Sequence, residues 1–511
     1  MAARAVVSGL RPLLCGGRWT SGSRSAHVLD PDTGDVVAEV AMAGPDEVER
    51  ALGAAAAAVH RDWPADARAA ALDAAATSVA ESAEHFAMLI AAEGIKTVRE
   101  ARREVARAVG TLRLSAAAAG DAAASDPGVG WRGFVRRDPV GVVVAVTPYN
   151  DPLNLVAHKA GPALAAGNPV IVKPDPRTPL SALLLAATLL DAGVPQDRLS
   201  VLPADGAVAG PLVGDRRVRL VSFTGGRATG ALVRRAADGK RLVMELGGIC
   251  PTLVLAGADL DRAVPALVDG AFAAAGQNCL HVQRILVHDS LYEQARAMLT
   301  DATRQVRPGR KADPAADMGP MIDPAARARI ERIVDEARSA GARILTGGAP
   351  DGPRFLPTLV EGLPRGTTLA EQEVFGPVTV LERFQTTREA VALANLGDGG
   401  LQAGVFAADP EPAMALVREL DVGTVVIGGT SDNRSDAMPF GGTGAAGIGR
   451  EGVPYAVDAM TEPKTVLLTD PTWEPPPIPP TADSTWSTDT SVNGHGEDHR
   501  FTHPGSPASL T

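Results

Sequence analysis

Hydrophobic residues recur at helical spacing through the first quarter of the chain. The segment 44–60 begins with the acids Asp46 and Glu47 and continues with regularly spaced apolar residues, which predicts an amphipathic helix. Two longer helical stretches follow, over 66–93 and 97–119. Their alanine runs need no functional explanation, because alanine is the best helix former.

The pattern changes at Gly141. Short runs of β-branched residues at 142–146 and 170–172 flank a predicted helix over 153–165, which indicates a strand, helix, strand unit. The alternation continues through predicted elements at 183–192, 199–202, 218–223, 228–237 and 242–244. This order predicts an α/β fold with a doubly wound parallel sheet, and a further alternating set over 251–426 predicts a second α/β domain.

Both ends of the chain differ from its body. The first eleven residues contain Arg4 and Arg11 but lack a long apolar centre, so we predict a frayed end, with an organellar targeting peptide as the alternative. Residues 471–511 are rich in Pro, Ser, Thr, Asp and His, which predicts a disordered tail. No apolar run reaches the roughly 20 residues that span a bilayer, so we expect no membrane partner.

Composition narrows the class of protein. A chain of 511 residues is too long for one compact core, which favours two or three domains. The net charge of −11 is spread without a basic stripe, so we expect no nucleic-acid partner. The three cysteines lie far apart in the sequence, at Cys15, Cys250 and Cys279. This spacing predicts neither disulfide bonds nor a metal site built from thiols. Free thiols are typical of the reducing cytoplasm, where we expect the protein.

Three polar residues stand out from this background. Cys279 follows a stretch of small residues that lets a ligand approach the backbone, although a lone cysteine is also a common small core residue. Glu245 follows an apolar strand directly, where a carboxylate is costly, unless it is a surface acid at the strand end. Asn150 lies in the turn after another strand, at the ligand-binding edge of the sheet, or it caps the helix beginning near Leu153.

Taken together, these motifs resemble the aldehyde dehydrogenase superfamily, and the branch they resemble most contains lactaldehyde and phosphonoacetaldehyde dehydrogenases. Further matching motifs follow in the family's order, at 173–179, 223–230, 371–377 and 439–451. The resemblance covers about residues 14–470. It implies a cofactor domain with a doubly wound sheet, a second α/β catalytic domain and a small β oligomerisation element.

The resemblance also implies boundaries and assembly. We expect the NAD(P)-binding domain at 14–120 and 140–247, the catalytic domain at 248–440, and the oligomerisation element with a closing segment at 121–139 and 441–470. The family assembles through a hairpin, here about 121–138, and a late strand near 464–468. Isolated strand pairs are marginal alone, so we expect a homodimer or homotetramer.

The implied chemistry assigns one role to each of the three residues. Cys279 attacks the aldehyde and forms a thiohemiacetal. The Asn150 amide and the Cys279 backbone N–H stabilise the oxyanion. After hydride transfer to the nicotinamide, Glu245 activates the water that hydrolyses the thioester. The motifs imply no metal.

The implied cofactor is NADP or NAD. The residues that match the family's cofactor contacts are Thr147, Pro148, Tyr149, Lys173, Gly225, Gly226, Gly230, Leu246, Glu373 and Phe375. Many members carry a glutamate three positions after the lysine, where an acid would repel a 2′-phosphate, but this chain has Pro176 followed by Arg177. Because of this departure, we expect a slight preference for NADP over NAD.

The substrate is expected to be a small polar or anionic aldehyde. Asp151, Leu155 and His158 occupy positions that line or flank the entrance in the family, without the aromatics that serve aliphatic aldehydes. His158 is expected to bind a polar group of the substrate, or else to be a histidine packed against the sheet. Asn278 stands where phosphonate-oxidising members have arginine, which disfavours a phosphonate.

Two other functions fit the same motifs. In a CoA-acylating semialdehyde dehydrogenase, coenzyme A resolves the thioester, but this reaction does not need the base that Glu245 provides. A non-catalytic structural homologue would keep the fold without the chemistry. The presence of both Cys279 and Glu245 disfavours it.

Overall fold

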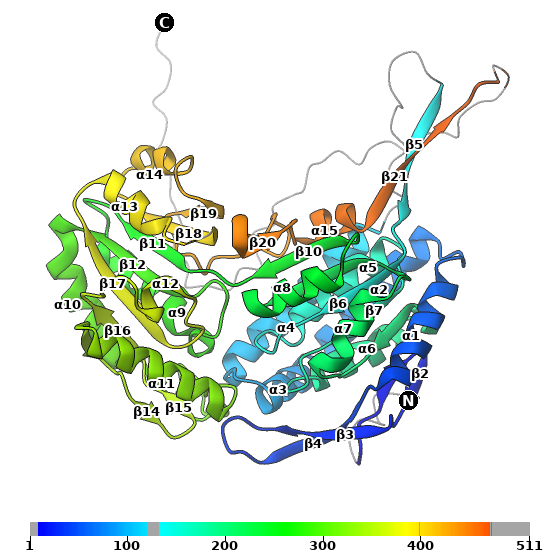
Figure 1. Cartoon of the computed structure of the whole chain (residues 1–511), viewed down its shortest axis with the longest axis horizontal. Helices are drawn as coiled ribbons and strands as arrows, with labels where there is room; N and C mark the ends of the chain where they lie inside the picture. The colour runs from blue at the N-terminus through cyan, green and yellow to red at the C-terminus, as the bar shows by residue number, and fades with distance from the viewer. Residues whose placement is uncertain (1–8, 120–131, 398, 471, 473–511) are drawn as a thin grey trace, which may run out of the picture. The chain divides into compact units, whose positions relative to one another are not determined.

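The computed structural model describes residues 9–119, 132–397, 399–470 and 472 (Figure 1). The expectations for residues 1–8, for the hairpin at 121–131 and for nearly all of the tail lie outside the described residues. Contacts group the chain into two compact units, Met1–Asp121 with Arg137–Lys464, and Ala122–Arg136 with Thr465–Thr511. No helix of the described residues is both long and apolar enough to cross a membrane.

An eight-stranded sheet organises the first half of the chain, in the order β2-β1-β8-β7-β6-β9-β10-β20. Its strands are β1 (Leu13–Cys15), β2 (Arg18–Thr20), β6 (Val142–Val146), β7 (Val170–Lys173), β8 (Leu199–Val201), β9 (Val218–Gly225), β10 (Arg241–Leu246) and β20 (Gly447–Ile448). β8, β7, β6, β9 and β10 run parallel, whereas β1 and β20 join antiparallel. The predicted doubly wound parallel sheet is confirmed.

Helices bury both faces of this sheet. They are α1 (Pro45–Ala58), α2 (Ala65–Glu81), α3 (Ala83–Glu93), α4 (Val98–Ala117), α5 (Asn154–Ala165), α6 (Leu180–Asp191), α7 (Gly206–Gly214) and α8 (Arg227–Ala236). In β6, Val143 and Ala145 pack with α2 to α6, while Val142, Val144 and Val146 pack with α1, α7 and α8. Because successive side chains of a strand point to opposite faces, such a strand is apolar throughout.

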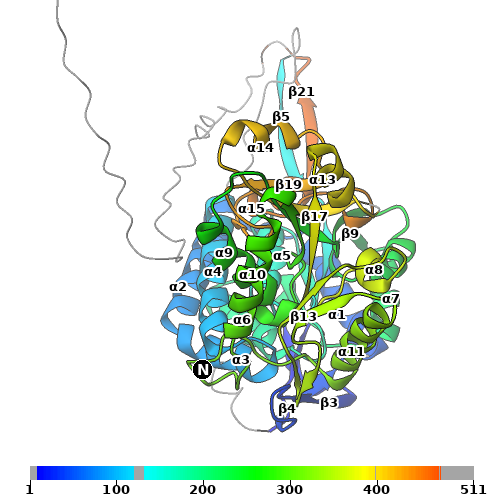
Figure 2. The ribbon, with the colours of Figure 1, turned by 90° about the vertical axis from the view of Figure 1, so that its left-hand side faces the viewer.

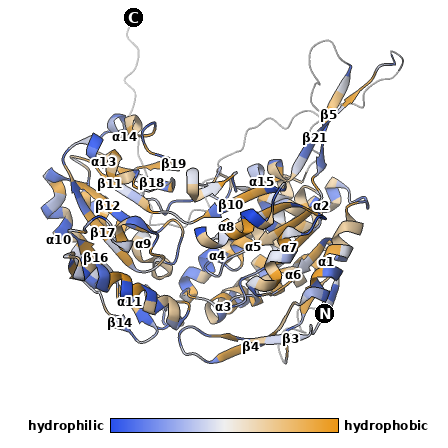
Figure 3. Cartoon of the chain, viewed as in Figure 1, coloured by the Kyte–Doolittle hydropathy of each residue, from blue (hydrophilic) through white to orange (hydrophobic). Residues whose placement is uncertain are grey.

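A seven-stranded sheet forms the second α/β layer, in the order β13-β16-β17-β12-β11-β18-β19. Its strands are β11 (Cys250–Val254), β12 (Val282–His288), β13 (Arg343–Thr346), β16 (Thr358–Glu361), β17 (Val378–Phe384), β18 (Gly400–Phe406) and β19 (Val422–Ile427). One face packs on α9 (Leu260–Phe272), α10 (Asp289–Gln305) and α11 (Pro324–Ser339), the other on α13 (Thr387–Ala394) and α14 (Pro410–Leu416). Figure 2 shows α9 and α10 side by side on their face. In Figure 3, α10 and α11 carry both hydrophilic and hydrophobic residues, as expected of covering helices.

Short elements complete the fold. β3 (Arg24–Leu29) pairs with β4 (Val36–Met42), β14 (Pro350–Asp351) with β15 (Arg354–Phe355), and β5 (Gly133–Pro139) with β21 (Thr461–Leu467). The remaining helices are α12 (Thr368–Glu371), α15 (Val453–Ala459) and the 3₁₀ turns η2 (Gln196–Arg198), η3 (Ala273–Gly276) and η4 (Gly444–Ala446). The expected late strand therefore starts three residues earlier than predicted.

The structure differs from the sequence prediction in three places. The helix predicted over 66–93 is two helices, because the backbone leaves helical geometry at Ser82 (φ −101°, ψ 18°). The antiparallel strands β1 to β4 were not predicted. β20 pairs with β10 in the first sheet, a pairing that was not predicted.

Candidate active site

The expected cofactor residues gather at one edge of the first sheet. The turn Thr147–Asn150 follows β6, Lys173 ends β7, Gly225 ends β9 and Leu246 ends β10. These four strands are consecutive neighbours in the sheet and run parallel, so their carboxyl ends meet at the same edge. This edge is where open α/β sheets bind ligands.

Several polar groups at this edge have no partner in the described part of the protein and are available to a ligand. Thr147 Oγ1 and Glu373 Oε1 are buried without a hydrogen-bond partner among the described residues. Burial raises the pKa of Glu373 to about 7. Helix α8 starts after Gly226 with no side-chain cap, and a Cβ built at Gly226 would meet open space. Free N–H groups at a helix start suit a pyrophosphate, and an unpartnered carboxylate suits ribose hydroxyls, so these residues fit NAD(P).

Arg177 is engaged elsewhere. Its guanidinium binds both carboxylate oxygens of Asp175 and also Asp323 (2.8 Å), and it stacks over the Tyr149 ring at 4.3 Å. A guanidinium with these partners does not reach out to a 2′-phosphate. Of the two basic residues behind the expectation for NADP, only Lys173 lacks such partners within the described part of the chain.

The loop that leads to Cys279 is strained. Ala274 and Ala275 adopt left-handed φ angles of 51° and 54°, which cost non-glycine residues about 1–2 kcal/mol each. The loop is held from α4, where the Glu100 carboxylate accepts the Ala274 N–H at 2.7 Å. Gly276 also has positive φ, and a Cβ there would lie 2.2 Å from the Gly376 carbonyl. This geometry brings Cys279 to the start of β12.

The Cys279 thiol is half-buried. Its Sγ lies 3.7 Å from Asn278 Oδ1, and the Cys250 thiol donates to the Cys279 carbonyl at 3.3 Å. Burial raises the pKa of the Cys279 thiol, while the nearby Arg434 guanidinium opposes this shift.

Glu245 is a buried acid within β10. It is 3% exposed, and neither carboxyl oxygen has a hydrogen-bond partner in the described chain. Burial and the neighbouring Glu451 raise the pKa of Glu245 well above its usual value, while Arg434 and Lys159 oppose the shift. The alternative of a surface acid at a strand end is therefore wrong. Glu245 also acts on the pKa of Cys279, which places the two groups near each other.

Asn150 is 7% exposed and does not cap α5. The cap comes from Glu104 on α4, whose Oε1 accepts the N–H groups of Leu153 (2.8 Å) and Asn154 (3.0 Å). The capping alternative for Asn150 is therefore wrong, and no described residue hydrogen-bonds to its buried Oδ1. The turn is tied to the cysteine loop, because the adjacent Tyr149 hydroxyl donates to Gln277 Oε1 at 3.3 Å.

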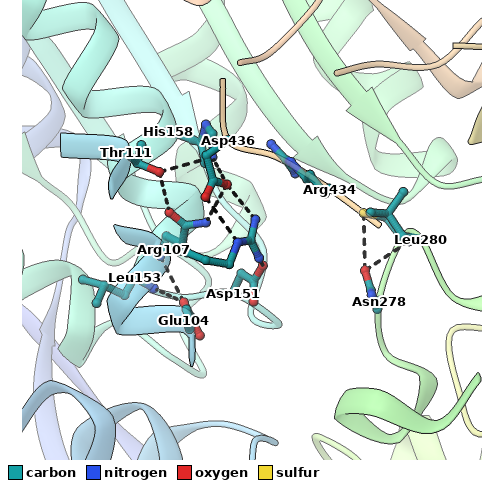
Figure 4. A network of polar contacts seen from close by, with 12 residues as sticks. Glu104, Arg107, Thr111, Asp151, Leu153, His158, Asn278, Leu280, Arg434 and Asp436 are labelled. Atoms are coloured by element: carbon teal, nitrogen blue, oxygen red, sulfur yellow. Dashed lines mark hydrogen bonds and ion pairs between the residues drawn. The ribbon is translucent and has the colours of Figure 1, made fainter. Parts of the chain in front are cut away.

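The expected substrate residues lie partly in a charged network (Figure 4). His158 is 1% exposed, and its Nε2 lies 2.8 Å from Asp436 Oδ1, which favours the alternative of a packed histidine. Asp151 pairs with Lys96 and Arg107. The remaining two are Leu155, which is 4% exposed, and Asn278, which contacts the Cys279 thiol.

Sequence reasoning missed Arg434. Its side chain is 7% exposed, its carbon Cζ lies 3.7 Å from the centre of the Phe440 ring, and one nitrogen lies 3.4 Å from Glu451 Oε2. Its Nε is buried without a partner among the residues described. The only local signal was the charged run 432–436, which follows β19 and precedes the motif at 439–451.

Comparison with known proteins identifies the family. The model of the aldehyde dehydrogenase family matches residues 19–466. Aspartate-semialdehyde dehydrogenase 1 of Pseudomonas canavaninivorans is 42% identical over 451 residues, covering 86% of this chain and 96% of its own. A 3-sulfolactaldehyde dehydrogenase of Priestia aryabhattai is 38% identical over 464 residues, covering 89% and 97%.

A solved structure agrees in fold. The glyceraldehyde-3-phosphate dehydrogenase of Methanocaldococcus jannaschii, complexed with NADP, aligns with a TM-score of 0.84 and 33% identity, covering 88% of this chain and all of that one. The resemblance inferred from the motifs is confirmed, as is the expected fold class. The protein belongs to the aldehyde dehydrogenase family and is an NAD(P)-dependent aldehyde dehydrogenase.

Proposed function

We propose that this enzyme oxidises a small anionic aldehyde to its carboxylic acid through a thiohemiacetal on Cys279. The observation that carries the proposal is the buried guanidinium of Arg434, which acts on both Cys279 and Glu245 and has an unpartnered Nε within the described chain. A guanidinium with a free donor recognises carboxylate, sulfonate or phosphate groups. The names of the three compared relatives support this class, since each names an aldehyde with an anionic group.

The first step is attack of the Cys279 sulfur on the aldehyde carbon. The thiol must lose its proton, and the Arg434 cation favours the thiolate against the cost of burial. The new C–S bond leaves a negative charge on the former carbonyl oxygen. The Asn150 amide and the Cys279 N–H are its donors, and loss of one such donor costs about 10²- to 10³-fold in rate.

Bound NAD(P) supplies the acceptor for the hydride that leaves the thiohemiacetal carbon. The residues that would hold it are those at the sheet edge and in the segment of Glu373, namely Thr147, Pro148, Tyr149, Lys173, Gly225, Gly226, Gly230, Leu246, Glu373 and Phe375. Lys173 alone supports the slight preference for NADP, because the Arg177 guanidinium is paired with Asp175 and Asp323.

The thioester left on Cys279 is then hydrolysed. Glu245 takes a proton from the attacking water, a step usually worth about 10²- to 10⁴-fold. It must first lose its own proton, and Lys159, which pairs with Glu451, favours the anion. A buried base near the sulfur supports hydrolysis over transfer to coenzyme A.

Two variants test this proposal. Cys279→Ala should abolish turnover and keep cofactor binding, while the buried Cys15→Ser should leave turnover unchanged. Glu245→Gln should produce one equivalent of reduced cofactor and then turn over about 10²- to 10⁴-fold more slowly. Turnover by Cys279→Ala, or a CoA thioester as the product when CoA is present, would contradict the mechanism. Equal kcat/KM for matched anionic and neutral aldehydes would contradict the substrate class.

A further inference from the structure

The side-chain amide of Asn278 is held at both ends, and Figure 4 shows the contacts of its oxygen with the sulfur and with Leu280. Its Nδ2 donates to Asp432 Oδ1, and its Oδ1 accepts the backbone N–H of Leu280 at 3.0 Å. The same Oδ1 lies 3.7 Å from the Cys279 sulfur. A backbone N–H only donates, and the Asp432 carboxyl oxygen accepts here although burial raises the pKa of Asp432 to about 7, so a single orientation of the amide satisfies both partners. That orientation presents the carbonyl to the thiol.

Asp432 is placed to fix this orientation. It follows β19, its side chain is partly buried, and Asn278 is the only described residue that hydrogen-bonds to its carboxylate. Asp269 of α9, Arg107 of α4 and Lys96 also act on it electrostatically. Because this partly buried carboxylate has one hydrogen-bond donor among the described residues, losing that hydrogen bond is costly.

The orientation matters for the sulfur. A carbonyl oxygen accepts from a thiol S–H but repels a thiolate, whereas an amide N–H would stabilise the thiolate. We propose that Asp432 is a positioning residue, which locks the Asn278 amide with its carbonyl towards Cys279 and so keeps the thiol protonated in the free enzyme. The inference rests on the proposed role of Cys279 as the nucleophile, and it adds a role for two residues that do not react.

Alkylation of Cys279 by iodoacetamide, followed by mass spectrometry across pH on the full chain, measures this directly. Asp432→Asn keeps the shape but can present an N–H to Asn278, which lets that amide turn its own N–H to the sulfur at the cost of the hydrogen bond from the Leu280 N–H. We expect roughly tenfold faster alkylation at neutral pH, with the midpoint of the pH profile about one unit lower. The matched control Asp269→Asn removes a nearby acid that does not bind Asn278 and should change the rate less than twofold. Cys279→Ala gives the background from Cys15 and Cys250.

A double-mutant cycle separates positioning from simple charge removal. Asn278→Ala removes the carbonyl, so it should also accelerate alkylation, and Asp432→Asn should then add less than twofold. An equal acceleration by Asp432→Asn in both backgrounds, or none in the wild-type background, would overturn the proposal. Should Asp432→Asn fail to fold, an unchanged rate in Asn278→Ala would overturn it instead. Turnover by Cys279→Ala refutes the proposed function separately, because alkylation reports on the thiol without any aldehyde.

Discussion

Replacing Arg434 with methionine removes a buried cation at nearly constant length. A charge-assisted hydrogen bond contributes about 1.5–3 kcal/mol, and each 1.4 kcal/mol is a factor of ten. If the guanidinium binds the anionic group of the substrate, Arg434→Met should lower kcat/KM for 4-oxobutanoate by about 10- to 150-fold relative to butanal, which has the same carbon chain without the carboxylate.

The comparison of two aldehydes is needed because Arg434 also lowers the pKa of Cys279 and of Glu245. Losing that effect slows the oxidation of both substrates, whereas losing anion recognition slows only one. Arg450→Met is the matched control, since Arg450 also acts on Glu245 but, within the described chain, donates only to the carbonyls of Gly442 and Gly449. The reasoning is refuted if steady-state kinetics show the same loss for both aldehydes in Arg434→Met.

Three further outcomes can be measured. Glu451→Gln removes the negative charge that raises the pKa of Glu245, so the acid limb of the kcat against pH profile should move to lower pH; an unchanged limb would contradict this. Glu104→Ala leaves two N–H groups at the start of α5 without acceptors, which should lower the free energy of unfolding in urea by about 2–6 kcal/mol, whereas no change would show that water replaces the cap. Although burial opposes it, Arg107 holds the pKa of Asp436 below its usual range, so the contribution of Asp436 to stability should be complete at neutral pH and lost as pH falls below about 4; Asp436→Asn should flatten that part of the thermal stability profile.

The sequence predicted the parts of the site that local patterns determine. Asn150 follows β6 and Glu245 lies near the end of β10, and parallel strands bring such positions to one edge, whereas Cys279 lies in a recognisable loop before β12 of the other sheet. Arg434 had no such pattern, because it reaches the cysteine from a loop more than 150 positions later in the chain. Its role depends on which side chains surround it, and sequence spacing does not reveal that.

The residue that caps helix α5 was not predicted, for a related reason. Local preference favoured Asn150 as the cap of α5, but the cap is Glu104, which stands 46 positions earlier in the chain. Helix packing between α4 and α5 supplies an acceptor that local preference does not consider. The helix break at Ser82 was missed similarly, since an alanine-rich stretch contains no glycine or proline to mark it.

The charged network between α4 and α5 bears on attempts to change the substrate of this enzyme. Glu104 caps α5, Lys96 joins Glu104 to Asp151, and Arg107 joins Asp151 to Asp436. Each of these residues therefore pairs with at least one other, and a single replacement removes a partner from at least one remaining charge. Libraries that vary these five positions will retain more folded members if they exchange all five as one block taken from a relative than if they vary them independently.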